Sequence, residues 1–262
     1  MSSIRKPAVA GSFYPSDARQ LHQTITQLLQ QAAKQQGPVP KAIIAPHAGY
    51  IYSGPVAASA YARIQAARDR IKCVVLLGPA HRVPFYGLAA SSADYFATPL
   101  GTIPVDQIDI RRLTELPQVK ILDEAHTDEH SLEVNLPFLQ ECLGDFSLIP
   151  LVVGSTTPEE VCEVLESVWG GDETLIVISS DLSHYYDYDT ARRLDSATSH
   201  AIESLNPDAI EYESACGRIP VNGLLVIAKK LGLHAHSIDL RNSGDTAGPR
   251  DQVVGYGAFE FN

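Results

Sequence analysis

Two stretches decide the fold of this 262-residue chain, Lys41-Ala-Ile-Ile-Ala-Pro-His47 and Cys73-Val-Val-Leu-Leu-Gly-Pro-Ala-His81. Each is a short apolar run that ends in a proline and a histidine, and such runs are typical of strands buried on both faces of a sheet. A third run of the same design, Thr174-Leu-Ile-Val-Ile-Ser-Ser-Asp181, leads to His184. Because ligands bind at the carboxyl ends of strands in open α/β sheets, these three polar strand ends predict one common site.

Strand and helix patterns alternate along the rest of the chain. An alanine-rich helical pattern from Pro55 to Asp69 joins the first two runs into a βαβ unit. Residues 83–104 are rich in proline, glycine and serine and are expected to form a long loop or hairpin over the site. The chain has no evident linker, so we expect one domain over residues 1–262. Other helices are expected over 16–33, 105–116, 131–143, 158–169, 188–205 and 220–231, and other strands over 147–153, 234–240 and 253–261.

Composition and charge exclude several classes of protein. Hydrophobic residues form 45% and charged residues 19% of the chain, as in a soluble protein with a large core. The 20 basic and 31 acidic residues give a net charge of −11, which disfavours binding to nucleic acid or to anionic membranes. No apolar stretch is long enough to span a bilayer. We therefore expect a cytoplasmic protein, and its four scattered cysteines, which form no CxxC pair, agree with a reducing compartment.

His47 and His81 are the first candidates for metal ligands. They are one βαβ step apart, so the two strand ends are expected to lie side by side. Neutral imidazole is a common ligand for zinc, iron and copper, although each histidine alone is also compatible with a hydrogen-bonded loop residue. Asp245, in a glycine-containing segment after a later strand, can complete a two-histidine, one-carboxylate set that leaves positions on Fe(II) open. The alternative for Asp245 is a turn-forming aspartate.

Three further residues are candidates for catalysis. Asp181 and His184 leave the third strand within one tight turn or helical turn of each other, which directs both side chains into the same crevice. Asp181 can bind a metal, orient an imidazole or cap a helix, whereas His184 can serve as a ligand or as a general acid or base. His130 adjoins the start of an expected helix, where Glu133 is compatible with a structural role through the helix dipole. Cys216 is either a packed thiol or a reactive one.

Five motifs occur in order along almost the full chain: Ile43-Ile-Ala-Pro-His-Ala-Gly-Tyr50, Leu77-Gly-Pro-Ala-His81, Asp128-Glu-His-Ser-Leu-Glu133, Ser179-Ser-Asp-Leu-Ser-His184 and Cys216-Gly-Arg-Ile-Pro220. Together they resemble the Memo family. The family takes its name from a mediator of ErbB2-driven cell motility. Its prokaryotic members belong to the AmmeMemoRadiSam system and are often encoded beside AMMECR-type and radical SAM proteins, so the resemblance implies a functional link with those proteins.

The resemblance also implies a fold, a cofactor and its ligands. Memo proteins share the fold of class III extradiol dioxygenases, so we expect an α/β protein, a three-layer α/β/α sandwich around a mixed, largely parallel sheet. Those dioxygenases use non-haem Fe(II) to open catecholic rings, which makes Fe(II) the expected metal and copper or zinc the alternatives. His47 and His81 match the two histidine ligands, and His184 matches a histidine in the same pocket. The third ligand is expected in the segment 242–248, from Asp245 or Ser243.

Three functions are compatible with these residues. The first is a metal-dependent, dioxygenase-like oxidoreductase in which His47, His81 and Asp245 hold the metal and His184 moves protons. The second is metal-assisted hydrolysis by the same ligands. The third is a non-catalytic module that binds a peptide or a small molecule in the crevice, since a fold does not settle a function. Four tyrosines are near enough in sequence to line the pocket: Tyr50, Tyr52, Tyr185 and Tyr186.

Overall fold

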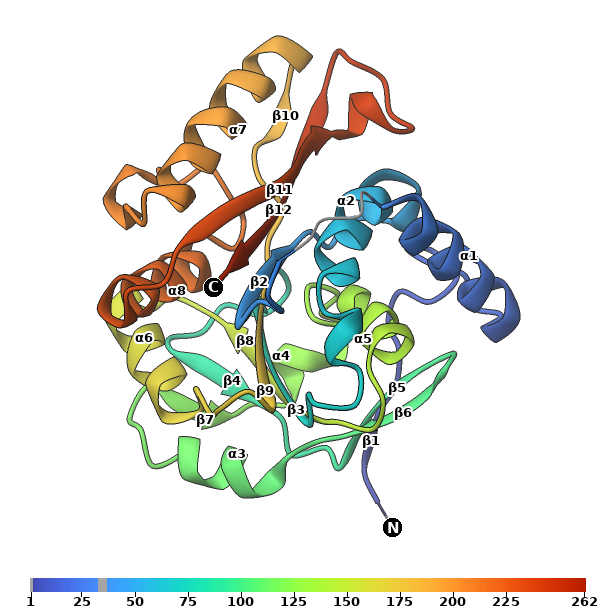
Figure 1. The fold of residues 1–262 in the computed structure, drawn as a ribbon. Coiled ribbons are helices and arrows are strands. Elements are labelled where there is room, and N and C mark those ends of the chain that lie inside the picture. The colour runs from blue at the N-terminus through green and yellow to red at the C-terminus, as the bar shows by residue number, and fades with distance from the viewer. Residues whose placement is uncertain (1, 33–36) are drawn as a thin grey trace.

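Within residues 2–32 and 37–262, which the computed structural model describes, a mixed nine-stranded sheet forms the centre of the molecule (Figure 1). Its strands in spatial order are β10 (His184–Tyr186), β12 (Val253–Phe261), β2 (Ala42–Ala45), β9 (Thr174–Ser179), β3 (Cys73–Pro79), β8 (Ser147–Val153), β4 (Leu88–Ala90) and β7 (Val119–Ile121), and β11 (Ala235–Asn242) also pairs with β12. The central strands β2, β9, β3 and β8 are parallel. Antiparallel pairs join β12 to β2 and β4 to β8, so the sheet is mixed, as predicted.

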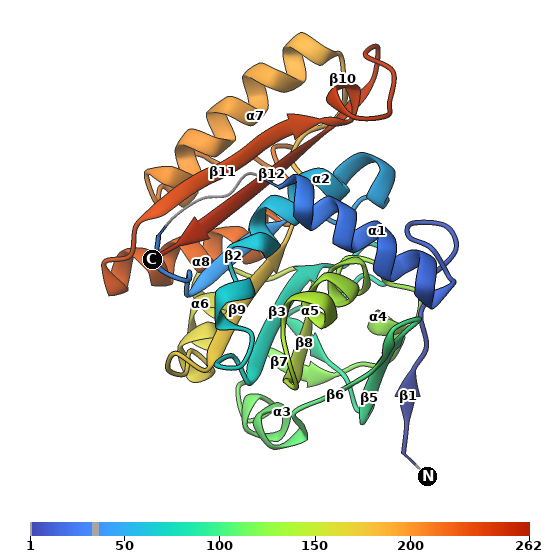
Figure 2. The ribbon, with the colours of Figure 1, turned by 45° about the vertical axis from the view of Figure 1, so that its right-hand side comes forward.

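Helices cover both faces of this sheet, which confirms the predicted three-layer sandwich (Figures 1 and 2). One face carries α1 (Ala18–Gln31), α2 (Tyr50–Ala62) and α5 (Leu136–Cys142). The opposite face carries α6 (Pro158–Ser167), α7 (Tyr188–Glu203) and α8 (Arg218–Leu231). Two shorter helices are α3 (Gln107–Leu113) and α4 (Glu124–Thr127). None of the helices in the described residues is both long and apolar enough to cross a membrane.

The parallel strands bring three loops to one edge of the sheet. Strands β2 and β9 consist of residues that are all buried, and burial stabilises such strands by roughly 25 cal/mol for each Å² of apolar surface removed from water. Their register pairs Ala45 with Ser179, and β3 runs parallel beside β9, so the chain leaves all three strands at the same edge. His47, His81 and Asp181 follow these three strand ends, as the sequence predicts.

Residues 83–104 were expected to form a long loop or a hairpin, and the structure shows a hairpin in place of the long loop. They contain β4 and the hairpin of β5 (Tyr95–Thr98) and β6 (Gly101–Pro104), which forms a separate three-stranded sheet with β1 (Ile4–Arg5). The hairpin alternative is thus confirmed and the long-loop alternative was wrong. The sequence could not decide between them because these strands are three or four residues long, too short to show a clear period. They form by pairing with distant segments, β4 with β8 and β5 with β1.

Helix α2 begins at Tyr50, well before the expected start at Pro55. Gly49 is its N-cap, and Pro55 lies inside the helix. Proline is usually found in the first turn of a helix, which is why the sequence pattern misplaced the boundary. The helix expected over 16–33 is α1, and residue 33 lies outside the described residues. The described residues also form short 3-10 helices at Gln65–Ala67, Glu133–Asn135, Pro207–Ala209 and Ser243–Asp245.

Candidate metal centre

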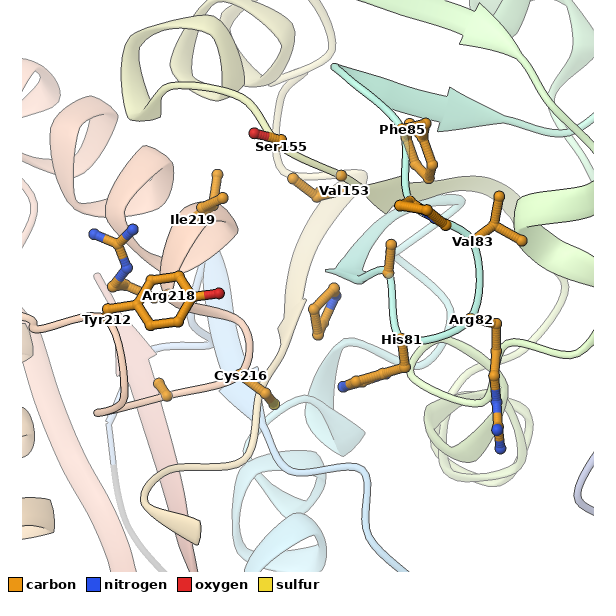
Figure 3. A pocket seen from close by; sticks show the side chains of 15 residues that line it. His81, Arg82, Val83, Phe85, Val153, Ser155, Tyr212, Cys216, Arg218 and Ile219 are labelled. Carbon is orange, nitrogen blue, oxygen red and sulfur yellow. The ribbon is translucent and has the colours of Figure 1, made fainter.

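Two histidines and one cysteine converge at the carboxyl edge of the sheet. His47 follows β2, His81 follows β3, and Cys216 precedes α8. One potential ligand atom of each residue lies within 4.8 Å of the others. The Cys216 Sγ atom is 3.3 Å from His47 Nε2, and the imidazole centroids of His47 and His81 are 5.2 Å apart. Figure 3 shows the side chains of His81 and Cys216 close together at one end of a cavity. The sequence predicted both histidines as ligands but did not predict the cysteine.

Cys216 reaches this position because its loop packs against the end of β9. A Cβ atom on Gly217 would lie 2.6 Å from the Cβ of Ser180, so a glycine is required for this close approach. The Gly217 N–H donates to Ser180 Oγ at 3.0 Å, and the Cys216 N–H donates to the carbonyl of Asp181 at 3.3 Å. The Asp181 N–H in turn donates to Cys216 Sγ at 3.3 Å. These contacts direct the sulfur toward His47.

The second ring nitrogen of each histidine is held by a hydrogen bond. His47 Nδ1 is 2.7 Å from Ser179 Oγ, whose own hydroxyl donates to the Ser131 carbonyl, so the imidazole donates and its Nε2 is left to face Cys216. His81 Nδ1 is 2.9 Å from Glu129 Oε1, which leaves Nε2 of His81 available as a ligand. Hydrogen bonds of this kind fix the tautomer and the orientation of metal-binding histidines.

Glu129 is the buried carboxylate that orients His81, and the sequence reasoning did not identify it. It accepts the backbone N–H and the imidazole of His81 at 2.6 and 2.9 Å, and the N–H groups of His130 and Ser131 at 3.0 Å each. Burial alone raises the pKa of Glu129, but the hydrogen bonds and charge of His81 and the backbone N–H of Ser131 outweigh it and lower the pKa to about 2. A carboxylate that is ionised at pH 7 therefore supports the histidine.

Burial lowers the pKa of three imidazoles at the site, those of His47, His130 and His184, which favours their neutral forms at pH 7. It is the main cause that lowers the pKa of His47 well below its usual value, and it lowers the pKa of His130 to about 4. The pKa of His184 is also lowered by burial. Burial and the nearby Asp181 carboxylate raise the pKa of the Cys216 thiol, so metal binding to this sulfur requires loss of a proton.

The three residues predicted for catalysis all border the same cavity. The ring of His130 stacks on His81 at a centroid distance of 4.7 Å. His184 begins strand β10 rather than a helical turn, so the predicted turn after Asp181 was wrong; pairing of β10 with β12 extends the chain there. The Asp181 carboxylate is buried, accepts the His47 N–H at 2.8 Å and has its pKa raised to about 7, mainly by burial. Asp181 therefore holds the loop that carries His47.

Asp245 does not join His47 and His81. Its Oδ1 accepts the Tyr188 hydroxyl at 2.6 Å, and its Oδ2 accepts the Asn242 N–H at 3.1 Å in a capping box of a short 3-10 helix. Asp245 therefore has the turn-forming role that was the alternative expectation for this residue. The other residue expected there, Ser243, lines the cavity while its Oγ accepts the Val254 N–H at 3.1 Å.

The cavity beside the three converging residues has a volume of about 800 Å³, and four aromatic side chains are part of its wall: Phe13, Tyr52, Tyr185 and Tyr256. Of the four tyrosines that the sequence suggested, Tyr52 and Tyr185 line it. Tyr50 is buried and donates to the Val134 carbonyl, and Tyr186 donates to Glu213. The cavity is large enough for a small organic molecule or the end of a peptide.

The donor set fits a transition metal. Two ligands bound to one ion at 2.0–2.3 Å lie no more than roughly 4.5 Å apart, which small side-chain rotations achieve from the observed arrangement. Thiolate and imidazole are the ligands that zinc, copper and iron accept, whereas calcium and magnesium prefer oxygen. Each imidazole already has its second nitrogen occupied, by Ser179 for His47 and by Glu129 for His81.

Fold and site together define an α/β protein with a candidate two-histidine, one-cysteine metal centre at the carboxyl edge of its sheet. The chain belongs to the Memo family, because residues 5–260 match the family described as Memo-like protein. It is 38% identical to a MEMO1 family protein of Aquifex aeolicus (strain VF5), over 97% of each chain. It is 35% identical to one of Metallosphaera sedula, over 98% of this chain and 99% of that one. The predicted family is thereby confirmed.

A solved structure shows the same fold at low sequence identity. The uncharacterized protein JW3007 from Escherichia coli K12 matches 83% of this chain and 98% of its own, with a TM-score of 0.55 and 13% identity. At this identity the likeness concerns the arrangement of helices and strands alone.

Proposed function

We propose that this protein is a metal-dependent oxidoreductase whose Fe(II) or copper is held by His47, His81 and Cys216. The observation that carries the proposal is the convergence of three donor atoms within 4.8 Å from three separate loops. Each imidazole is held by its own hydrogen-bond partner, which is the arrangement that prepares a site for an ion. The resemblance to a family related to class III extradiol dioxygenases supports the redox assignment.

A redox-active metal at this site supplies electron transfer to or from an organic ligand in the adjoining cavity. The chain itself contributes three functions. The aromatic side chains of the cavity wall can bury the apolar part of a ligand. His130 and His184 border the cavity as neutral imidazoles and can accept a proton from the ligand. Asp181 fixes the backbone of His47 through its N–H.

The ligand we propose is a small molecule or the end of a peptide that enters this cavity. A functional link with AMMECR-type and radical SAM proteins rests on the resemblance to the prokaryotic members of the family. Metal-assisted hydrolysis by zinc is the competing reaction, since a thiolate and two imidazoles also suit that ion. Redox activity of the bound ion distinguishes the two reactions, because a catalytic zinc ion also keeps a position open.

The test is anaerobic reconstitution with Fe(II), followed by addition of nitric oxide and electron paramagnetic resonance. We expect the signal of an iron–nitric oxide complex in the native protein, because three protein ligands leave positions open. The signal should be lost in His81→Ala and kept in Asp245→Asn, which alters a carboxylate that is hydrogen-bonded away from the site. Iron that binds without taking up nitric oxide would contradict the oxidoreductase proposal.

A further inference from the structure

A second cavity also borders the candidate metal centre. Its volume is about 480 Å³, and it shares His81, Arg82 and Cys216 with the first cavity. Figure 3 shows Arg218 and Tyr212 on one side of this second cavity and Arg82 beyond His81 on the other. Among the described residues that line it, no aspartate or glutamate is found, although the chain has 31 acidic residues. The charged side chains at this cavity are therefore arginines.

Neither arginine has a carboxylate partner in the described part of the chain. Arg218 is half-buried, and its guanidinium lies 5.6 Å from the centre of the exposed Tyr212 ring. Arg82 is exposed and forms no salt bridge or side-chain hydrogen bond to any described residue. The arginines that serve the fold are different, because Arg5 and Arg63 are buried against Glu133 and Glu260.

An unpaired guanidinium at the wall of a cavity favours an anionic ligand. It offers five N–H donors in a planar arrangement that matches carboxylate and phosphate oxygens. The attraction is stronger in a cavity than on an open surface, because less water screens it. The net charge of −11 would repel an anion elsewhere, so a cavity without acidic residues stands out in this molecule. Arg218 also follows Cys216 by one glycine, which ties its position to that of the sulfur.

We infer that the Arg218 cavity binds an anionic group, a carboxylate or a phosphate monoester, of the ligand whose reacting part lies beside His81 and Cys216. This inference rests on the proposed function only in one respect, namely that the part of the ligand beside His81 and Cys216 is the part that reacts. The ligand then spans both cavities. Its apolar part contacts Tyr52 and Tyr185 in the first cavity, and its charged group contacts Arg218 in the second. Arg82 adds positive charge at the opposite edge of the second cavity. The substrate class is accordingly an organic anion rather than a neutral molecule.

The experiment is a titration of the metal-free protein with inorganic phosphate and, separately, with benzoate, followed by NMR of the protein at low salt. We expect saturable chemical-shift changes. Arg218→Gln should lower the affinity obtained from them at least tenfold, since a hydrogen bond to a charged group is lost. Arg218→Lys should restore part of the affinity. Arg192→Gln is the matched control, because Arg192 also lies over a tyrosine ring, at 5.7 Å from the centre of Tyr188, but lines neither cavity.

Each result of the titration either supports or overturns the inference. Binding that Arg218→Gln weakens and Arg192→Gln preserves supports the inference, and the preferred probe shows whether carboxylate or phosphate is recognised. Equal binding by all variants, or no saturable binding of either probe, overturns it. If Arg218→Gln fails to fold, Arg82→Gln must weaken binding severalfold for the inference to stand. Because the titration uses metal-free protein, a failure of the metal proposal would appear only in metal-binding measurements and not here.

Discussion

Glu129 and Glu133 lie four positions apart in one motif, and both are buried carboxylates that accept four hydrogen bonds. Glu129 accepts from the backbone and imidazole of His81 and from two backbone N–H groups of its own loop. Glu133 accepts from Arg5, from the N–H groups of Ala8 and Val9, and from the Tyr14 hydroxyl. The first carboxylate therefore holds a candidate metal ligand, and the second holds the N-terminal segment on the core.

The comparison teaches that burial and a full set of donors do not by themselves mark a functional carboxylate. Both side chains are at most 2% exposed. They differ in what lies at the other end of their hydrogen bonds, an imidazole that borders a cavity in one case and a structural arginine and tyrosine in the other. Substitutions of the two glutamates should separate stability from metal binding.

The largest effect is expected for Glu133→Gln. This change leaves the buried Arg5 without its ionic partner, and breaking a buried pair costs about 3–5 kcal/mol. The free energy of unfolding from urea denaturation should fall by that amount. Metal affinity, measured on the fraction that remains folded, should stay within about twofold of the native value, since no hydrogen bond to His81 changes. Loss of metal binding without loss of stability would contradict the structural role of Glu133.

The next effect is expected for Glu129→Gln. An amide has one acceptor oxygen in place of two and donates from its nitrogen, so the imidazole of His81 loses its fixed orientation and much of its basicity. Loss of such a partner typically costs about 10–100-fold in metal affinity. Calorimetric titration with Fe(II) measures it, and urea denaturation should show a smaller loss of stability than Glu133→Gln. An unchanged affinity would mean that Glu129 serves only the fold.

The smallest effect is expected for the pH dependence of stability and arises from His126, which shortly precedes Glu129 in the sequence. His126 is buried, donates to the Ala89 carbonyl through Nε2, and has its pKa lowered to about 4, mainly by burial. As the pH falls, the His126 imidazole becomes protonated in the unfolded chain before it does so in the folded protein. The free energy of unfolding therefore decreases between about pH 6.5 and pH 4. Above that range this group has no effect on it. The loss between pH 7 and pH 5 is on the order of 1–2 kcal/mol.

Urea denaturation at the two pH values tests this prediction. His126→Gln keeps a donor for the Ala89 carbonyl and removes the titration, so its stability should change less between pH 7 and pH 5 than that of the native protein. His22→Gln is the matched control, because His22 lies on the surface and its side chain is 58% exposed. An equal pH dependence in the native protein and in His126→Gln would show that other groups cause the acid sensitivity.

Much of the fold was predictable because its central strands are continuous apolar runs that end in polar loops. The strands over 147–153 and 253–261 have the expected bounds. Within 83–104 a hairpin was expected only as an alternative to a loop. The bounds and partners of its short strands were not predictable, because they form by pairing with distant segments and show too little period of their own.

The candidate site was predictable only where a strand pattern placed its residue. His47 and His81 follow such strands, and the structure brings them together. Cys216 lies between two helices, and its approach to His47 depends on the contact of Gly217 with Ser180, which no local pattern indicates. A glycine directly after the cysteine was the available signal. Sequence alone also gave no reason to prefer Glu129 over Glu133, because both precede the same helix.

The central claim is that Cys216 completes the metal centre with His47 and His81, and anaerobic calorimetry with Fe(II) tests it most directly. The native protein should bind one ion, Cys216→Ala should bind it at least a hundredfold more weakly, and Asp245→Asn should bind it as the native protein does. Weakened binding in Asp245→Asn together with native affinity in Cys216→Ala would contradict the claim.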